Sequence, residues 1–263
     1  MTFLDFMEKK PKEGKLIILR HDVDRSPGRA MQLAELENQA GVRGTYYFRI
    51  KEAMFPEDEI KKTAAMGHEI GYHYEDLDVA RGDVEKALAS FKRNLESLRK
   101  IVPVRTICMH GSPMSRFDNR KLWRDHDYRS YGIIGEPYFD IDYNEVMYLT
   151  DTGRRWDGDR VSIRDKVRGE RLEVRGQKTE VRSQESESGK KFSDEKNNEI
   201  IKRPKLHSTQ DIINALRNGE LPDQIMLTIH PQRWTDDWGP WVWELMSQKV
   251  KNVVKYLIVK SRQ

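Results

Sequence analysis

Residues 16–24 constrain the fold of this chain more than any other segment, because the run Leu-Ile-Ile-Leu stops at Arg-His-Asp-Val-Asp. Four apolar residues bounded by polar ones predict a strand that is buried on both faces, as in a parallel sheet. Folds of that kind place their chemistry at the carboxyl ends of the strands. Since side chains alternate along a strand, we expect Asp22 and Asp24 on one face and Val23 on the other.

Asp22 and Asp24 form a carboxylate pair, and such a pair repels itself unless a cation lies between the two groups or one of them holds a proton. Perturbed carboxylate pairs concentrate at functional sites, so the pair favours a site at this strand end. The alternative is that both aspartates cap the end of the strand, with Asp24 capping the helix that follows.

The rest of the chain alternates between the apolar patterns of strands and helices. Strands are expected at 44–48, 68–73, 104–109, 131–134, 146–149 and 225–229, and helices at about 26–41, 56–67, 83–101, 208–219 and 238–256. The strands end in polar residues, which predicts an α/β fold whose parallel strands form a barrel with a site at one end. An open doubly wound sheet would alternate in the same way, but no glycine-rich phosphate loop follows the first strand.

The length of 263 residues is ordinary for one α/β barrel, so we expect a single domain covering residues 1–263. Within it, residues 169–205 are polar and charged and carry almost no apolar side chains. Such a stretch cannot bury enough surface to offset the entropy of ordering. We predict a flexible insertion at 169–205 that is dispensable for chemistry.

The net charge of +4, on a chain with 34% charged residues, is too mild and too evenly spread to favour nucleic acid as a partner. No segment approaches the ~18 apolar residues of a membrane span, and no secretory signal pattern opens the sequence. We therefore expect a cytoplasmic protein without a membrane partner. The single cysteine, Cys108, excludes an intramolecular disulfide and a zinc site built from several thiolates.

Seven polar side chains follow the expected strands. They are Asp22, Asp24, His73, His110, Glu136, Asp151 and His230. Carboxylates and imidazoles suit zinc or another divalent first-row metal, which would activate water or polarise a carbonyl. A lone histidine is more often a packed or capping residue, but three of them at the ends of separate strands favour a metal site.

Three segments that contain some of these residues together resemble the polysaccharide deacetylase superfamily, the carbohydrate esterases of family 4. The segments are Leu-Arg-His-Asp-Val-Asp at 19–24, Gly-His-Glu-Ile-Gly-Tyr-His at 67–73 and Leu-Thr-Ile-His-Pro at 227–231. The resemblance covers about residues 15–250 without the insertion and marks a divergent member. It implies a distorted (β/α)7 barrel, a divalent metal that is usually zinc, and removal of acetyl groups from chitin, peptidoglycan or related amino sugars.

The resemblance also implies roles for single residues. Asp22 matches the family's general base, and Asp24 matches its metal-binding aspartate, although the family usually has these two residues adjacent. His73 matches the first metal-binding histidine, and His230 matches the histidine that protonates the leaving amine. A base and an acid on opposite sides of a Lewis acid suit hydrolysis of an amide.

One position departs from the family pattern, because the second metal-binding histidine would stand at Leu77. Leucine cannot bind a metal. Glu75 or Asp76 on the same loop, or His110 from the next strand, could complete three protein ligands. We expect a rebuilt set in which Asp24 and His73 are joined by His110 or Glu75. His68 begins its strand, away from the site, and is expected to be structural.

Four further residues are candidates for binding the substrate. They are Trp234, Glu136, Asp151 and Arg154. Trp234 follows His230 closely enough to line the site, and tryptophan rings pack well on sugars. The other three match no family motif, and each could instead pair with a neighbouring charge.

The sequence thus predicts a metal-dependent hydrolase that removes an acyl group from an N-acylated amino sugar or a related small amide. With a cytoplasmic location, a small molecule or oligosaccharide is the expected substrate, such as a soluble glycan precursor. A non-catalytic binder of glycan or protein, with a degraded metal site, is one alternative, which Leu77 supports. A metal-free glycoside hydrolase using Asp22 or Asp24 with Glu136 as its carboxylate pair is another.

Overall fold

The computed structural model describes residues 1–11, 13–50, 55–111, 115–152, 156, 206–235, 238, 239 and 242. The predicted insertion at 169–205, Arg154 and nearly all of the expected last helix lie outside these residues. The extent of the single domain over 1–263 therefore stays a prediction.

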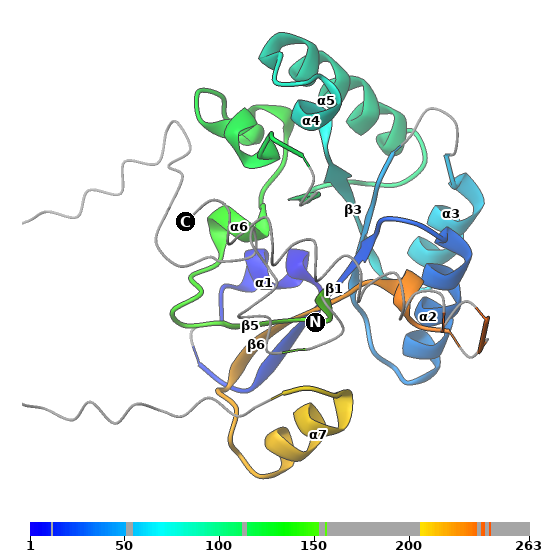
Figure 1. Ribbon diagram of the computed structural model, residues 1–263, viewed down its shortest axis with the longest axis vertical. Coiled ribbons are helices and arrows are strands. Elements are labelled where there is room, and N and C mark those ends of the chain that lie inside the picture. Colours follow the sequence, from blue (N-terminus) through cyan, green and yellow to red (C-terminus); the bar gives the residue numbers. More distant parts are fainter. Residues whose placement is uncertain are drawn as a thin grey trace, which may run out of the picture.

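Six parallel strands form one sheet in the order β4-β3-β2-β1-β6-β5 (Figure 1). They are β1 (Leu16–Val23), β2 (Thr45–Phe48), β3 (Glu69–Tyr74), β4 (Ile107–Met109), β5 (Met147–Thr150) and β6 (Gln224–Ile229). Each strand lies close to its expected range, so the α/β class with a parallel sheet is confirmed.

Closure into a seven-stranded barrel is not confirmed. The expected strand at 131–134 is reduced to an isolated parallel bridge between Thr106 and Gly135, on the far side of β4. Within the part of the chain that the structure describes, the ladders end at β4 and β5, so the sheet forms a half-barrel. The segment from 128 to 131 is a 3-10 helix that ends at Gly132 with a positive φ of 71°, which leaves few residues for a strand before Glu136.

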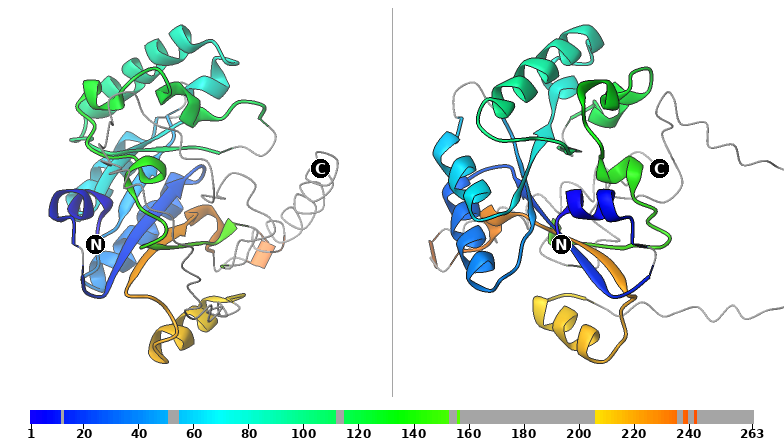
Figure 2. Two further views of the ribbon diagram at one scale, coloured as in Figure 1. Left: turned by 90° about the vertical axis from the view of Figure 1, so that its left-hand side faces the viewer. Right: turned by 180° about the vertical axis from the view of Figure 1, so that it is seen from behind.

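Helices pack around the outer side of the sheet (Figure 2). Four match the expected ranges, namely α2 (Pro27–Gln39), α3 (Glu57–Ala65), α5 (Val84–Arg99) and α7 (Thr209–Arg217). The short helices α1 (Phe3–Lys9), α4 (Asp76–Val79) and α6 (Pro137–Asp140) were not expected, and neither were the 3-10 helices η1 (Asn119–Trp123), η2 (Tyr128–Tyr131) and η4 (Pro231–Arg233).

β1 lies at the centre of the sheet and continues past its apolar run to Val23. Its first six residues pair with β6, and the segment Arg20–Val23 pairs with β2. The polar end of β1 is therefore fixed by backbone hydrogen bonds and is buried, with Asp22 only 4% exposed. As predicted, Asp22 and Asp24 share one face of the strand, and Val23 joins the apolar core on the other.

The inner face of the sheet is closed at the amino ends of the strands by α1. The backbone N–H of Phe3 donates to the Thr45 hydroxyl at 2.7 Å, and that of Leu4 donates to the Glu69 carboxylate at 2.8 Å. Phe3 packs there against Ile18 and Met226 in an inner apolar cluster. The carboxyl ends of the strands are thus the end of this face at which a site can open.

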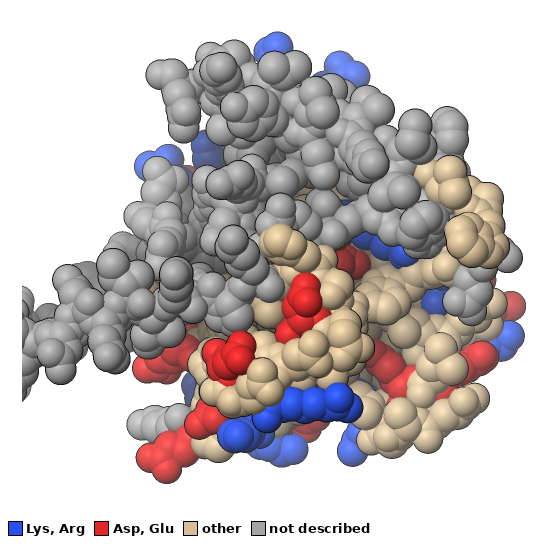
Figure 3. Space-filling model, turned by 60° about the horizontal axis from the view of Figure 1, so that its bottom comes forward, with Lys and Arg blue, Asp and Glu red and all other residues tan. Residues whose placement is uncertain are grey.

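The described part of the chain contains no helix long and apolar enough to cross a membrane. On the face seen in Figure 3, acidic and basic side chains of the described residues occur side by side.

Candidate metal centre

Three side chains converge beyond the carboxyl ends of β1, β3 and β4. Asp24 follows β1, His73 lies near the end of β3, and His110 follows β4. One ligand atom from each lies within 4.8 Å of the others. The Oδ1 atom of Asp24 is 3.3 Å from Nε2 of His73 and 3.5 Å from Nε2 of His110. The structure therefore brings together the ligands that the rebuilt set requires.

The dimensions and the chemistry of these three groups fit a divalent ion. Zinc bonds of about 2.0–2.1 Å in a tetrahedron imply ligand-to-ligand distances of about 3.3–3.4 Å, close to the two distances that Asp24 makes. Oδ1 of Asp24 is buried and has no hydrogen-bond partner among the described residues. A buried carboxylate oxygen without a partner is costly, and a cation between it and the two imidazoles would remove that cost.

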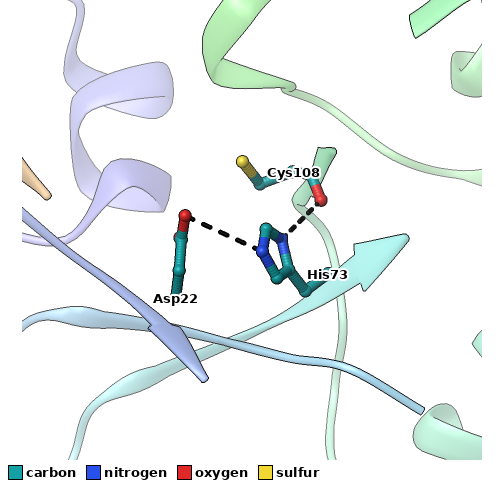
Figure 4. A group of neighbouring side chains, drawn as sticks. All are labelled: Asp22, His73 and Cys108. Atoms are coloured by element: carbon teal, nitrogen blue, oxygen red, sulfur yellow. Dashed lines mark hydrogen bonds and ion pairs between the residues drawn. The ribbon is translucent and has the colours of Figure 1, made fainter. Parts of the chain in front are cut away.

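The ring of His73 is oriented by the main chain. Its Nδ1 lies 2.9 Å from the carbonyl oxygen of Cys108, as Figure 4 shows. A carbonyl only accepts, so Nδ1 carries a proton, and Nε2 is the nitrogen that faces the aspartates. Nε2 lies 3.7 Å from Oδ2 of Asp22, on the side opposite the Cys108 contact. This is the tautomer that a metal-binding histidine needs.

A second group, with Asp22, His73 and Cys108, also brings three possible ligand atoms within 4.8 Å. All three residues are buried. The carboxylate of Asp22 is already paired with the guanidinium of Arg20, whose positive charge opposes a metal ion at that position. The group around Asp24 is the better metal site.

Asp24 does not cap the helix that follows, which was the alternative to a site at this strand end. At the start of α2, Ser26 occupies the N-cap position without a side-chain hydrogen bond. Oδ2 of Asp24 instead accepts from the side-chain amide of Gln232 at 3.1 Å. The pKa of Asp24 lies well below its usual value, because burial, which opposes ionisation, is outweighed by His73, His110 and His230.

Glu75, which was predicted as a possible ligand, is not one of the three converging groups. Its Oε2 atom lies 3.1 Å from Nδ1 of His110, on the side of that ring away from Asp24. Arg49 binds the same carboxylate, with distances of 2.6 and 2.5 Å from Nη2 to Oε1 and Oε2. Burial opposes ionisation of Glu75, but His110 and Arg49 outweigh it and lower its pKa to about 2.

Asp76 and Leu77, the next two residues on that loop, belong to α4 and are buried. Leu77 is 4% exposed and belongs to the apolar core. Asp76 is buried and accepts hydrogen bonds from the hydroxyls of Tyr72 and Ser90, both at 2.7 Å. Both side chains are thus taken up by packing or by other hydrogen bonds, and His110 is the third group that could hold a metal with Asp24 and His73.

Asp22 is held by Arg20, two positions earlier on the same face of β1. Nε and Nη2 of Arg20 donate to Oδ1 and Oδ2 of Asp22 at 2.8 and 2.7 Å. Burial opposes ionisation of Asp22, but Arg20 and His73 outweigh it, so the pKa of Asp22 is lowered. Arg20 was not among the predicted site residues, although the alternation of side chains in Arg-His-Asp-Val-Asp places it on the same face as both aspartates.

His230, which also lies near Asp24, is paired with Asp151. Nδ1 of His230 lies 2.5 Å from Oδ1 of Asp151, and Nε2 lies 4.0 Å from Oδ2 of Asp24. Arg233 also donates to Asp151, at 2.7 Å. Burial and Arg233 oppose protonation of His230, but the carboxylates of Asp151 and Asp24 outweigh them, so the pKa of His230 is raised.

The residues predicted to bind substrate occupy different surroundings. Asp151 is 7% exposed, and its carboxylate is bonded to His230, Arg233 and Trp234, so it contacts protein groups that flank the site. Trp234 is 41% exposed beside them. Arg154 lies outside the described residues.

Glu136 is fully buried and bonds to the main chain. It accepts from the backbone N–H of Met109 at 3.0 Å and from that of Tyr138 at 2.6 Å, as the N-cap of α6. A carboxyl that is 0% exposed is shielded from substrate. This burial speaks against a glycoside hydrolase that uses Glu136 as one of its two carboxylates.

His68 lies at the amino end of β3, as expected for a structural residue. It accepts from the backbone N–H of Gly44 at 3.1 Å, and its Nε2 lies 3.0 Å from the carbonyl oxygen of Ala34. Both contacts join β3 to the neighbouring chain segments.

No family model matches the sequence, and no curated protein matches it. Among solved structures, the chain is similar to the Xyl-CE4 domain of a multidomain xylanase from the hindgut metagenome of Trinervitermes trinervoides, at 15% identity and a TM-score of 0.41, over 95% of this chain and 85% of that one. It is also similar to the peptidoglycan deacetylase PdaC from Bacillus subtilis, at 16% identity and a TM-score of 0.37, over 51% of this chain and 62% of that one. More than a third of the peptidoglycan deacetylase chain is thus unmatched. At these identities and scores, the function of the chain has to follow from its own residues.

Proposed function

We propose that this chain is a divergent relative of the polysaccharide deacetylases, and that it is a divalent-metal-dependent hydrolase. It removes an acyl group, in the first place acetyl, from an N-acylated amino sugar or a related small amide. Zinc is the proposed metal, since a carboxylate and two imidazoles at tetrahedral spacing suit it best.

One observation carries the proposal. The buried Oδ1 of Asp24 has no hydrogen-bond partner in the described chain, and Nε2 atoms from two different strands face it at 3.3 and 3.5 Å. Two further groups lie next to it: Oδ2 of Asp22 is 3.7 Å from Nε2 of His73, and Nε2 of His230 is 4.0 Å from Oδ2 of Asp24. An acid and a base that flank a cation site form the arrangement needed to hydrolyse an amide.

Asp24, His73 and His110 would hold the metal, which supplies Lewis-acid activation when it is bound. Asp22 is ionised and accepts a proton from the attacking water, while Arg20 holds its carboxylate in one orientation. Protonated His230 donates from Nε2 to the departing nitrogen, and Asp151 holds the proton at Nδ1. The opposite pKa shifts of Asp22 and His230 suit these opposite roles.

The substrate class follows from the family resemblance and from Trp234, whose partly exposed ring lies next to Asp151 and His230. The expected cytoplasmic location is part of the proposal, and it favours a soluble glycan precursor over an extracellular polymer. The ring of Trp234 would pack against one face of the sugar.

The test compares the wild type with Asp22→Asn, a variant of nearly the same size. Acetate release from N-acetylglucosamine and its short oligosaccharides is measured beside metal content in protein purified without chelators. The wild type is expected to hold one equivalent of divalent metal. The variant is expected to keep it and to lose about 10²–10⁴-fold in turnover.

Two other results would overturn the proposal in different ways. Wild-type protein that takes up no metal from a zinc solution would support the non-catalytic binder. Release of sugar without release of acetate would support a glycoside hydrolase. Loss of the metal in Asp22→Asn would instead exchange the roles of Asp22 and Asp24.

A further inference from the structure

A chain of charged side chains crosses the carboxyl ends of β2, β3 and β4. Arg49 follows β2, Glu75 follows β3, and His110 follows β4. The guanidinium of Arg49 contacts both carboxylate oxygens of Glu75, and Oε2 of Glu75 lies 3.1 Å from Nδ1 of His110. Nε2 on the other side of that ring faces Asp24 at 3.5 Å. The three residues thus form a line of contacts from the end of β2 to the proposed metal position.

The two metal-binding histidines are held in different ways. The ring of His73 is aligned by the backbone carbonyl of Cys108. The backbone of His110 is fixed, since its N–H donates to the carbonyl of Tyr74 at 2.8 Å, but the described contact of its Nδ1 is with the side chain of Glu75. The ring atom Nδ1 of His110 makes no hydrogen bond of regular geometry, so its contact with the carboxylate of Glu75 is an ion-pair contact.

Glu75 cannot turn away easily from His110. It directly precedes α4, where the buried Asp76 is bonded to Tyr72 and Ser90 and where Leu77 is packed in the core. These contacts fix the backbone of Glu75 at the end of β3. Arg49 then fixes its carboxylate with contacts at 2.5–3.0 Å to both oxygens.

We propose that Glu75, held by Arg49, is the positioning residue that aligns His110 as the third metal ligand. This inference rests on the proposed metal centre and explains how a histidine from β4 takes the place that Leu77 cannot fill. The carboxylate keeps the proton on Nδ1 and leaves the lone pair of Nε2 toward the ion, as partners of metal-binding histidines commonly do.

The experiment measures zinc affinity by competition with a chromophoric chelator, together with the visible absorption spectrum of the cobalt(II)-loaded protein. The variants are Glu75→Gln, Arg49→Met, His110→Ala and the double variant His110→Ala with Glu75→Gln. Glu37→Gln is the matched control, because Glu37 is also a half-buried glutamate beside a histidine, at 2.9 Å from His21, but on the other face of β1.

Glu75→Gln is expected to weaken zinc binding by about 10–100-fold and to change the cobalt spectrum, and Arg49→Met is expected to do the same to a smaller extent. In the His110→Ala background, Glu75→Gln should cause no further loss, because its effect passes through that ring. Glu37→Gln should bind zinc as the wild type does, which excludes a general effect of destabilisation.

Zinc binding by Glu75→Gln within about two-fold of the wild type, or a full additional loss in the double variant, would overturn the role of Glu75 and leave the metal centre intact. Wild-type protein that binds neither zinc nor cobalt would overturn the metal centre, and the role of Glu75 with it. The two failures are therefore distinguishable.

Discussion

On each face of β1 a largely buried carboxylate lies next to histidines, but the two groups are organised differently. On the outer face, Nε2 of His21 lies 2.9 Å from Oε1 of Glu37, and the hydroxyl of Tyr46 donates to Oε2 at 2.9 Å. On the inner face, Asp24 has one oxygen bonded to Gln232 and one oxygen without a hydrogen-bond partner among the described residues.

The difference lies in how far the charges are balanced within the protein. Glu37 has one oxygen bonded to the hydroxyl of Tyr46 and the other 2.9 Å from Nε2 of His21, and its pKa is lowered because His21 and Tyr46 outweigh the effect of burial. This group joins α2 to the sheet. Oδ1 of Asp24 faces two imidazole nitrogens at 3.3 and 3.5 Å, and in the proposed metal centre a cation would lie between these three atoms. Residue types alone do not separate a structural cluster from a site, but the pairing of their atoms does.

The largest expected effect comes from replacing each of the two carboxylates by its amide and comparing the variants. Asp24→Asn should lose stoichiometric metal and all measurable turnover while it stays folded. Glu37→Gln should keep metal and turnover but lose about 1–3 kcal/mol of the free energy of unfolding, since it removes the carboxylate that accepts from Tyr46 and lies against His21. Elemental analysis, acetate release and urea unfolding measure the three quantities.

A fall in metal content in Glu37→Gln, with the protein still folded, would break this comparison. Retained metal in Asp24→Asn would show that the inner face does not depend on a cation.

The next effect concerns Leu77, which stands where the family has its second metal-binding histidine. Leu77→His should cost about 2–5 kcal/mol of stability, because it places a polar ring in the apolar core and removes packed methyl groups. It should not restore metal binding to His110→Ala, since residue 77 faces the core. Urea unfolding and zinc titration test this. Recovery of zinc binding in Leu77→His with His110→Ala would show that the loop after β3 can still turn toward the metal.

A smaller effect concerns Glu136, an inner-face carboxyl that does not reach the site. Burial raises its pKa to about 8 from 4.5. Because the folded state holds this proton more tightly, the contribution to stability is complete below about pH 4.5 and is lost as the pH rises through about 8. The loss is on the order of a few kcal/mol. Glu136→Gln stays neutral, so its free energy of unfolding should fall less than that of the wild type between about pH 5 and about pH 9.

Urea unfolding at the two pH values measures this difference, and any fixed cost of the substitution cancels between them. Parallel changes in the wild type and in Glu136→Gln would contradict a neutral Glu136. Metal content should be the same in both proteins, as expected for a carboxyl outside the site.

The smallest effect concerns Trp234. Trp234→Ala should raise KM for an N-acetyl amino sugar by about 2–10-fold, the value of one aromatic contact, with little change in kcat. Trp234→Phe keeps a ring but loses the N–H that lies 3.3 Å from Asp151, so it should retain most of the affinity. A fall in kcat alone in both variants would instead indicate that Trp234 acts by holding Asp151.

The parts of the fold that follow from local sequence patterns were predictable. The apolar run of β1, its alternation and the polar strand ends gave the parallel sheet and the shared face of Asp22 and Asp24. The bridge at Gly135 and the helix α1 were not predicted, because their contacts are with distant strands and leave no periodic pattern in so few residues.

The residues of the site were predictable from the sequence, but the contacts between their side chains were not. Asp151 and His230 are 79 residues apart, and only the pairing of β5 with β6 brings them together. The choice between Glu75 and His110 was likewise undecidable from spacing, because it depends on how the chain turns into α4. Both residues lie at the candidate site, where His110 contacts Asp24 with one ring nitrogen and Glu75 with the other.

The contact between His73 and the carbonyl of Cys108 has a consequence for how such a protein can evolve. A carbonyl is present whatever amino acid a mutation puts at position 108, so the alignment of one ligand is inherited with the backbone. The alignment of His110 depends on separately encoded side chains at 49 and 75. If the proposed metal centre is correct, substitutions at 49 and 75 can therefore change the affinity for the ion without changing a ligand.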